Sequence, residues 1–305
     1  MTVPTDTLDP SLDLMDERIT AELPPFTVII PAYNEEAAIE ETLDRLSAGL
    51  RDAELDYEVI VVNDGSADGT AARLRDRDDI RLVEHHANRG YGASLKTGIR
   101  HSRHELIVIV DADGTYPLER IPELVRLAQR ADMVVGARTK SSQHSPLRLI
   151  PKWCLARFAE WMARSPIPDL NSGLRVFRKS VAERFVNILP SGFSFTTTIT
   201  LAMLTNGYLV HYEPIEYHPR IGRSKIRPIR DTLGFVQLIL RTGMYFAPLR
   251  VFLPVATVFF IGFLVTLTQD VINGNLNERT LLLLVAATQL AMFSLLADMI
   301  DKRTG

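Results

Sequence analysis

Five short apolar runs, separated by four stretches with helical spacing, constrain most strongly what this chain can fold into. The runs are rich in β-branched residues and lie at Phe26–Pro31, Tyr57–Val62, Ile80–Glu84, Leu106–Val110 and Asp132–Gly136. The intervening spacing of apolar residues predicts helices over 35–50, 67–77, 93–102 and 117–130. Strands and helices that alternate in this way predict an α/β fold with a mostly parallel sheet and helices on both faces.

Polar residues directly follow three of these predicted strands. The endings are Pro31-Ala32-Tyr33-Asn34-Glu35, Asn63-Asp64-Gly65-Ser66 and Asp111-Ala112-Asp113. Parallel strands end at one edge of their sheet, and open α/β sheets bind ligands outside that edge, so we expect the endings to converge. One such ending would be ordinary helix capping, the usual role of Asp and Ser there. Three together predict a nucleotide pocket.

Asp111 and Asp113 place two carboxylates two residues apart at the end of the fourth predicted strand. Hard oxygen ligands of this kind suit Mg²⁺ or Mn²⁺, which can bridge the phosphates of a nucleotide. The alternative is a polar turn in which Asp113 serves only the chain reversal. At the other endings, Glu35 and Asp64 can accept hydrogen bonds from a base or ribose, and Tyr33 can stack on a base.

A glycine-rich stretch, residues 88–93, lies between the third predicted strand and the next helix. Gly90 and Gly92 allow the backbone close to a ligand, and Arg89 offers positive charge, although such a turn alone is a weak signal. His85 and His86 just precede it. Adjacent strand positions point to opposite faces, so we expect these two histidines to be unremarkable rather than a metal pair.

Charge and cysteine content add few constraints. The 305 residues carry a net charge of −3, and we expect no nucleic acid as a partner. Cys154 is the only cysteine, which excludes an intrachain disulfide or a thiolate cluster and fits a catalytic portion in reducing cytosol. Residues 1–24 hold six acids and one base, and they favour a mobile tail over a short docked helix. We expect no secretory signal there.

Two uncharged apolar runs, Val251–Thr268 and Thr280–Ala297, lie near the C-terminus. A helix needs roughly 17–25 residues to cross a bilayer. The runs are adjacent, terminal and apolar on all faces, which favours a transmembrane hairpin over buried core helices. Basic residues before the first run and after the second predict that both ends of the hairpin lie in the cytoplasm. The catalytic domain would then be cytoplasmic as well. The basic, amphipathic segment before the hairpin can lie in the membrane interface or pack on the globular domain.

The predicted organisation therefore has five parts. They are an acidic tail over 1–24, a catalytic domain over 25–218, a juxtamembrane segment over 219–250, a transmembrane hairpin over 251–298 and a cytoplasmic tail over 299–305.

The three strand endings, taken together, resemble those of the family 2 glycosyltransferases with a GT-A fold. The resemblance covers about the first two-thirds of the chain and implies that Asp64 reads the nucleotide. It also implies that Asp111 and Asp113 hold the metal on the diphosphate of a nucleotide sugar. The full expected donor set is Pro31, Tyr33, Glu35, Asp64, Arg89, Gly90, Asp111, Ala112 and Asp113.

Three later stretches are similar to those of the polyprenyl-phosphate glycosyltransferases, which include dolichyl-phosphate mannose synthase. The stretches are 136–138, 169–175 and 220–225. The resemblance implies an acceptor-phosphate set of Arg138, Arg175, Arg220, Ser224 and Lys225. Arg and Lys suit a phosphate at a membrane surface, although anchoring to anionic lipid would need the same charges. The chain departs from the mannose synthases at Gly114-Thr115 and at Arg89–Gly92, which leaves the donor sugar open.

The implied reaction is an inverting transfer of one sugar from a UDP-glucose-like or GDP-mannose-like donor to undecaprenyl or dolichyl phosphate. Catalysis is assigned to Asp113 at the metal and to Asp169, which would orient the acceptor or take its proton. Asp169 could instead be a turn residue. Two alternatives stay open: a lipid-linked sugar or protein acceptor, and a membrane-anchored protein that binds nucleotide sugars without turnover. A homo-oligomer is possible.

Overall fold

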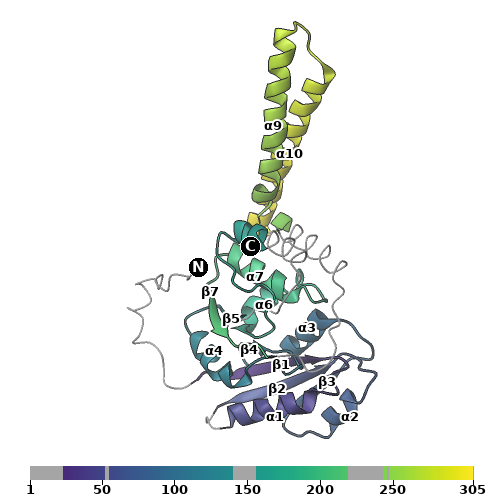
Figure 1. Cartoon of the computed structure of the whole chain (residues 1–305), viewed down its shortest axis with the longest axis vertical. Coiled ribbons are helices and arrows are strands. Elements are labelled where there is room, and N and C mark those ends of the chain that lie inside the picture. The colour runs from purple at the N-terminus through teal and green to yellow at the C-terminus, as the bar shows by residue number, and fades with distance from the viewer. Residues whose placement is uncertain (1–22, 52–54, 140–155, 219–242, 246, 305) are drawn as a thin grey trace. The chain divides into compact units, whose positions relative to one another are not determined.

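The structure is a computed structural model that describes residues 23–51, 55–139, 156–218, 243–245 and 247–304 (Figure 1). It divides into two compact units. The first comprises residues 1–140, 172–184 and 210–222, and the second comprises 141–171, 185–209 and 223–305. The expected acceptor residues Arg220, Ser224 and Lys225 lie outside the described residues, as does nearly all of the predicted acidic tail.

The first unit is built on one sheet of seven strands. They are β1 Phe26–Ala32, β2 Tyr57–Asn63, β3 Arg81–Glu84, β4 Leu106–Ile109, β5 Met133–Arg138, β6 Arg175–Arg178 and β7 Val210–Ile215. Their order is β3-β2-β1-β4-β6-β5-β7, and only β6 runs antiparallel to its neighbours β4 and β5. The prediction of a mostly parallel sheet is confirmed. The early strands alternate with α1 Ile39–Leu50, α2 Thr70–Arg75, α3 Tyr91–His101, η2 Leu118–Arg120 and α4 Ile121–Leu127, and α6 Lys179–Arg184 follows β6.

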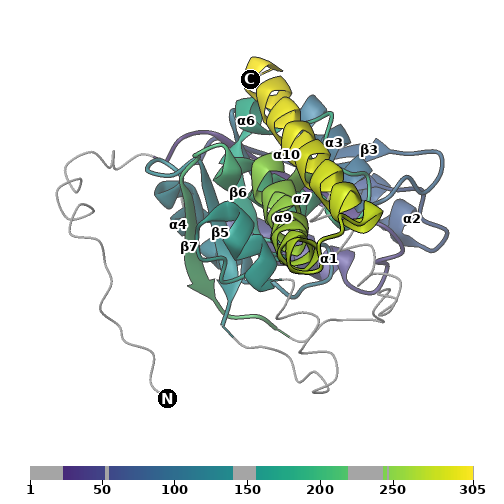
Figure 2. The same cartoon turned by 90° about the horizontal axis from the view of Figure 1, so that it is seen from above.

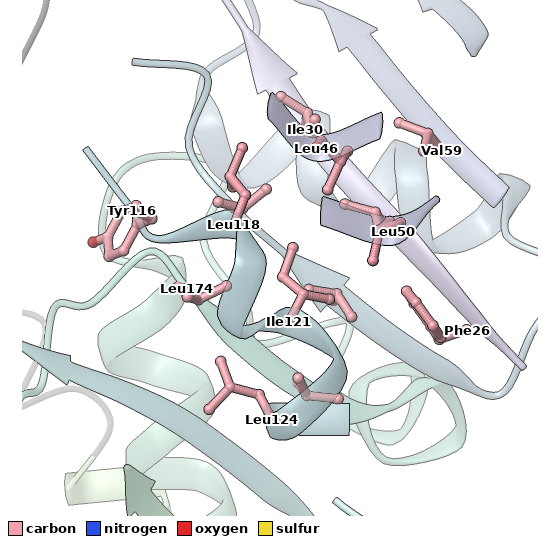
Figure 3. Packing of buried hydrophobic residues seen from close by; sticks show 14 of the residues in the cluster. Phe26, Ile30, Leu46, Leu50, Val59, Tyr116, Leu118, Ile121, Leu124 and Leu174 are labelled. Carbon is pink, nitrogen blue, oxygen red and sulfur yellow. The ribbon is translucent and has the colours of Figure 1, made fainter. Parts of the chain in front are cut away.

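Helices cover both faces of this sheet, and α1 and α3 lie on opposite sides of β1 and β2 (Figure 1). One face buries alternate strand residues such as Phe26 and Ile30 against Leu46 of α1 and Ile121 of α4 (Figure 3). Replacing a fully buried leucine such as Leu46 with alanine would cost roughly 2–5 kcal/mol of stability. On the other face, α3 packs so closely that a β-carbon on Gly98 would lie 2.4 Å from Ile29. The strand ends are therefore held on a rigid base.

The second unit contains a helical stretch at 156–163, α7 Phe195–Thr205, α9 Pro248–Ile272 and α10 Glu278–Thr304. Helices α9 and α10 lie side by side as a hairpin and hold the two predicted apolar runs (Figures 1 and 2). Both are long and apolar enough to cross a membrane, and most of their surface is not covered by protein. The expected tail from residue 299 continues α10 as helix to Thr304.

Asp270 closes the turn of this hairpin. Its carboxylate is buried and accepts hydrogen bonds from Thr280 Oγ1 at 2.6 Å and from the backbone and side chain of Asn277. Asn277 directly precedes α10 and Thr280 lies in its first turn, so Asp270 ties the end of α9 to the start of α10. The connection between the two helices is thereby fixed.

Candidate active site

The loops that follow β1 and β2 are joined to each other by hydrogen bonds. The backbone N–H of Asn34 donates to Ser66 Oγ at 3.0 Å, and the N–H of Ala67 donates to Asn34 Oδ1 at 2.8 Å. The N–H of Glu35 donates to Thr70 Oγ1 at 3.0 Å. Asn34 has a positive φ of 52°, a conformation that asparagine tolerates better than most residues. Two of the three predicted strand endings therefore converge.

Asp64, at the end of β2, is almost fully buried and organises the glycine-rich loop. Its Oδ1 accepts hydrogen bonds from His85 Nδ1 at 2.6 Å and from the Arg89 N–H at 2.9 Å. Its Oδ2 accepts from the Gly90 N–H at 2.8 Å. The other ring nitrogen of His85 meets Thr97 Oγ1 of α3 at 3.0 Å. The carboxylate thus already has several protein partners.

His85 belongs to this site, contrary to the expectation that it is unremarkable. Strand β3 ends at Glu84, so the rule that adjacent strand residues face opposite sides does not apply to His85 and His86. The register of β3 beside β2 brings the residue after Glu84 next to the end of β2. That position was the signal available in the sequence. His86 is exposed.

Gly65 and Gly90 allow the two loops to approach each other. Gly65 has φ +66°, and a β-carbon on it would lie 2.7 Å from the backbone carbon of Ala87. Gly90 has φ 98°, which strains any other residue type. The Asp-Gly pair after β2 therefore serves close backbone contact as well as a turn.

Asp111 follows β4 and is held by a tyrosine from the glycine-rich loop. The hydroxyl of Tyr91 donates to Asp111 Oδ1 at 2.9 Å. Burial raises the pKa of Tyr91 well above its usual value, and the negative charge of Asp111 raises it further. The hydroxyl therefore keeps its proton and acts as the donor.

Asp113 is buried two residues further on. Its Oδ1 accepts hydrogen bonds from Thr115 Oγ1 at 2.6 Å and from the Thr115 N–H at 3.3 Å. Thr115 is fully buried, and its carbonyl accepts from the N–H of His218 at 2.9 Å. Thr115, one of the departures from the mannose synthases, thus orients the second acid through its hydroxyl.

The start of β6 reaches the same sheet edge because β6 is antiparallel. Arg175 pairs with Ile109 of β4 and with Val135 of β5, so the residues just before it lie beside Asp111. Ser172 Oγ donates to the carbonyl of Gly136 at 2.6 Å, and the Gly173 N–H donates to Tyr116 Oη at 2.6 Å.

Arg175 is fully buried, which disagrees with its expected contact with an acceptor phosphate. Its Nε donates to the carbonyl of Ser172 at 2.8 Å, and one terminal nitrogen faces Met133 Sδ at 3.9 Å. Its positive charge acts on Tyr91, whose pKa it lowers against the larger effects of burial and Asp111. The enclosed guanidinium thus acts on the electrostatics of Tyr91, the hydrogen-bond partner of Asp111.

Arg138 ends β5 and is only partly buried. Its guanidinium lies over the ring of Tyr217, 5.3 Å from the ring centroid, and Tyr217 meets Tyr116 edge to face. Stacking of this kind holds a guanidinium in place. Of the expected acceptor residues, Arg138 is therefore the one in the described part of the chain that combines fixed position with exposure.

Asp169 belongs to the second unit and forms a local turn. Its Oδ1 accepts from the N–H of Asn171 at 3.1 Å, and Asn171 Oδ1 accepts from Thr197 Oγ1 at 2.8 Å. The turn role of Asp169 is thus visible, and its expected part in catalysis stays a prediction.

The carboxylates of Asp111 and Asp113 suit a cation whose remaining ligands come from a substrate. Within the described ranges, no three His, Cys, Asp or Glu side chains gather closely enough to form a metal site by themselves. Asp111 and Asp113 still offer hard oxygen ligands. Mg²⁺ usually binds through one or two carboxylates and completes its shell with substrate phosphates and water. Two acids at a ligand-binding sheet edge meet that requirement.

Comparison with known proteins decides the family. Residues 27–185 match Glycosyl transferase family 2, and residues 247–302 match the GtrB C-terminal hairpin. The chain belongs to glycosyltransferase family 2. The family match includes the three strand endings and the start of β6, so the resemblance inferred from the sequence is confirmed.

Two curated relatives of this chain carry the same name. The undecaprenyl-phosphate 4-deoxy-4-formamido-L-arabinose transferase of Shewanella sediminis is 30% identical over 234 residues, covering 73% of this chain and 68% of that protein. Its counterpart in Pseudomonas paraeruginosa is 33% identical over 182 residues, covering 55% and 54%. The chain thus spans between half and about two thirds of the length of these relatives.

Solved structures confirm the GT-A fold of this family 2 member. Glucosyl-3-phosphoglycerate synthase from Mycobacterium tuberculosis, in complex with Mn²⁺, UDP and phosphoglyceric acid, matches with a TM-score of 0.57 at 19% identity. The match covers 72% of this chain and 78% of that one. S. aureus TarS 1–349 matches with a TM-score of 0.52 at 17% identity, covering 75% and 69%.

Proposed function

We propose that this protein transfers one sugar from a nucleotide diphosphate sugar to a polyprenyl phosphate in a membrane. The observation that carries the proposal is the pair Asp111 and Asp113, fixed by Tyr91 and Thr115 at the ligand-binding edge of the sheet. Relatives named as undecaprenyl-phosphate sugar transferases, together with the apolar hairpin, support the acceptor class.

The donor is assigned to the edge formed by β1, β2 and β4. The backbone around Asp64 and Gly90 surrounds the nucleotide, and Tyr33 supplies a ring for stacking on its base. Asp111 and Asp113 hold Mg²⁺ or Mn²⁺, which when bound offsets the charge of the leaving diphosphate. The solved relative in complex with Mn²⁺ and UDP supports this assignment.

The acceptor phosphate is assigned to residues that the sequence resemblance implied. Arg138 donates to the lipid phosphate, together with Arg220, Ser224 and Lys225 from the segment that resembles the polyprenyl-phosphate enzymes. An acceptor that is already anionic needs orientation more than a strong base. Asp169 orients the phosphate or takes its proton, and attack on the anomeric carbon from the side opposite the diphosphate inverts the configuration.

The decisive experiment offers the purified protein in detergent a panel of labelled nucleotide sugars with undecaprenyl phosphate. Mg²⁺, Mn²⁺ and a chelator are compared. We expect one donor to give a labelled lipid, with the product absent in chelator and reduced at least 100-fold in Asp111→Asn and Asp113→Asn. Asp56→Asn, an exposed acid before β2, is the matched control. Full activity of either site variant contradicts the metal assignment.

The same assay, with a lipid-linked sugar and a protein also offered as acceptors, separates the other acceptor classes. Label that appears only on a lipid-linked sugar or a protein would replace the polyprenyl-phosphate assignment. Donor binding without any transfer would indicate a non-catalytic nucleotide-sugar protein.

Membrane topology has its own test. We propose that α9 and α10 cross the bilayer and that the catalytic domain is cytoplasmic. In a Cys154→Ser background, Leu276→Cys at the exposed hairpin turn should react with an impermeant thiol reagent from the extracytoplasmic side of intact cells. Reaction only after lysis contradicts this orientation.

A further inference from the structure

The glycine-rich loop connects the two acidic strand endings of the first unit. Asp64, at the end of β2, accepts the backbone N–H groups of Arg89 and Gly90. The next residue, Tyr91, donates its hydroxyl to Asp111 at the end of β4. Two consecutive residues, Gly90 and Tyr91, therefore contact two different acids: Asp64, assigned to the nucleotide, and Asp111, assigned to the metal.

The backbone of Tyr91 is fixed from both directions. On one side, the carboxylate of Asp64 holds Gly90, whose φ of 98° sets the course of the chain into α3. On the other side, Tyr91 is the first residue of α3, and Gly98 of that helix packs tightly on Ile29 of β1. A side chain that starts from so rigid a position places its hydroxyl reproducibly.

Asp111 is confined on its other oxygen as well. A β-carbon on Gly173 would lie 2.3 Å from Asp111 Oδ2, so the glycine backbone packs against this oxygen. Tyr91 holds Oδ1 at 2.9 Å. The Asp111 carboxylate therefore lies between the Tyr91 hydroxyl and the Gly173 backbone, and these two contacts limit its rotation.

We propose that Tyr91 is a positioning residue that fixes the orientation of the Asp111 carboxylate for the divalent cation, with Asp64 anchoring the loop that carries it. The inference rests on the proposed function, because it presupposes a cation at Asp111. Groups that orient a metal ligand typically change metal affinity by about 10–100-fold when removed. Tyr91→Phe removes only the hydroxyl and keeps the ring.

The test measures Mn²⁺ binding directly, from the electron paramagnetic resonance signal of free Mn²⁺, in the presence of UDP or GDP. We expect Tyr91→Phe to weaken nucleotide-dependent Mn²⁺ binding by about tenfold. Tyr57→Phe, which removes a hydroxyl from a tyrosine stacked on Phe26 at the start of β2, should bind as the wild type does. The thermal unfolding temperature of each variant, measured in chelator, reports whether the substitution has destabilised the fold.

The outcomes separate the two proposals. If the wild type shows no nucleotide-dependent Mn²⁺ binding, the proposed metal-dependent transfer fails. If the wild type binds Mn²⁺ and Tyr91→Phe binds it equally well, the positioning role is overturned while the transfer reaction stands. A loss of affinity that Tyr57→Phe shares, in step with a loss of thermal stability, also overturns the role.

Discussion

Gly173 packs its α-carbon against the carboxylate of Asp111, and the carboxylate occupies the space where a side chain would be. A β-carbon built on Gly173 would lie 2.3 Å from Asp111 Oδ2 and 2.6 Å from Cγ. The N–H of Gly173 is meanwhile held by Tyr116 Oη at 2.6 Å, so the backbone cannot easily withdraw. Any residue larger than glycine must move the acid.

Gly173→Ala should therefore impair transfer strongly while leaving the fold intact. Displacement of a catalytic group by about 1 Å can cost roughly 100-fold in rate, and we expect a loss of this order in kcat/KM. Gly192→Ala is the matched control, because no heavy atom lies within 4 Å of its added β-carbon. Sugar transfer by the two variants, measured with the wild type, checks the prediction. Equal activity of all three would contradict it.

Thr115 should be required for its hydroxyl. Its Oγ1 donates to Asp113 Oδ1 at 2.6 Å, and Thr115→Val keeps the shape of the side chain but removes this hydroxyl donor. We expect the Mn²⁺ concentration for half-maximal activity to rise about tenfold in Thr115→Val. Thr115→Ser restores the hydroxyl and should recover most of the loss. A serine variant as impaired as the valine variant would point to packing instead.

His85→Ala should act on donor binding more than on turnover. Without its Nδ1–H, the buried Asp64 carboxylate loses a donor at 2.6 Å, and the loop that Asp64 holds becomes less ordered. A hydrogen bond to a charged group contributes about 1.5–3 kcal/mol, so we expect KM for the nucleotide sugar to rise at least tenfold. His86→Ala, an exposed neighbour, should leave KM unchanged. Initial-rate kinetics over a donor titration distinguish the two variants.

Glu58 should make stability depend on pH. Burial raises the pKa of this carboxyl, but hydrogen bonds from Arg103 and Thr27 outweigh it and lower the pKa below its usual value. Because the folded-state pKa is depressed, the contribution is present above the unfolded pKa and is lost as pH falls through the folded pKa. Glu58→Gln should cost about 1 kcal/mol at pH 7.

Urea unfolding at pH 7 and at pH 3 tests the role of Glu58. The difference between wild type and Glu58→Gln should shrink as pH falls, because the wild-type carboxylate loses its charge as pH falls through its lowered folded-state pKa. A difference that stays constant over this range would assign the effect to packing rather than charge. Asp56→Asn, at an exposed neighbour of β2, provides the control.

Local patterns were enough to predict the strands and the edge at which they end. Leu106–Val110 reads as a buried strand because its residues are apolar and mostly β-branched, and β4 occupies Leu106–Ile109. Asp64 and Asp111 could be placed at one edge because parallel strands share their direction. Pro117–Arg130, in contrast, breaks into η2 and α4, a boundary that apolar spacing alone does not fix.

Contacts between distant segments were not predictable in the same way. Gly173 touches Asp111 because the antiparallel strand β6 lies between β4 and β5 in the sheet. No local feature of residues 175–178 indicates that this strand takes that position. Arg175 resembled a phosphate ligand because arginine has that chemistry wherever it is exposed. Its burial depends on the same strand order. Tyr91 likewise meets Asp111 only through tertiary packing.

The return of the chain to its sheet through β6 and β7 has an evolutionary consequence. The pairing of Ile109 with Arg175 and of Met133 with Val210 is set by the sheet, not by the length of the segments 141–171 and 185–209 that leave it. Doubling the length of a connecting loop adds only about 0.6 kcal/mol to its closure. These excursions can be lengthened, shortened or exchanged while the pairing of β4, β5, β6 and β7 keeps its geometry, so sequence change in the two segments leaves the acids at the sheet edge in place.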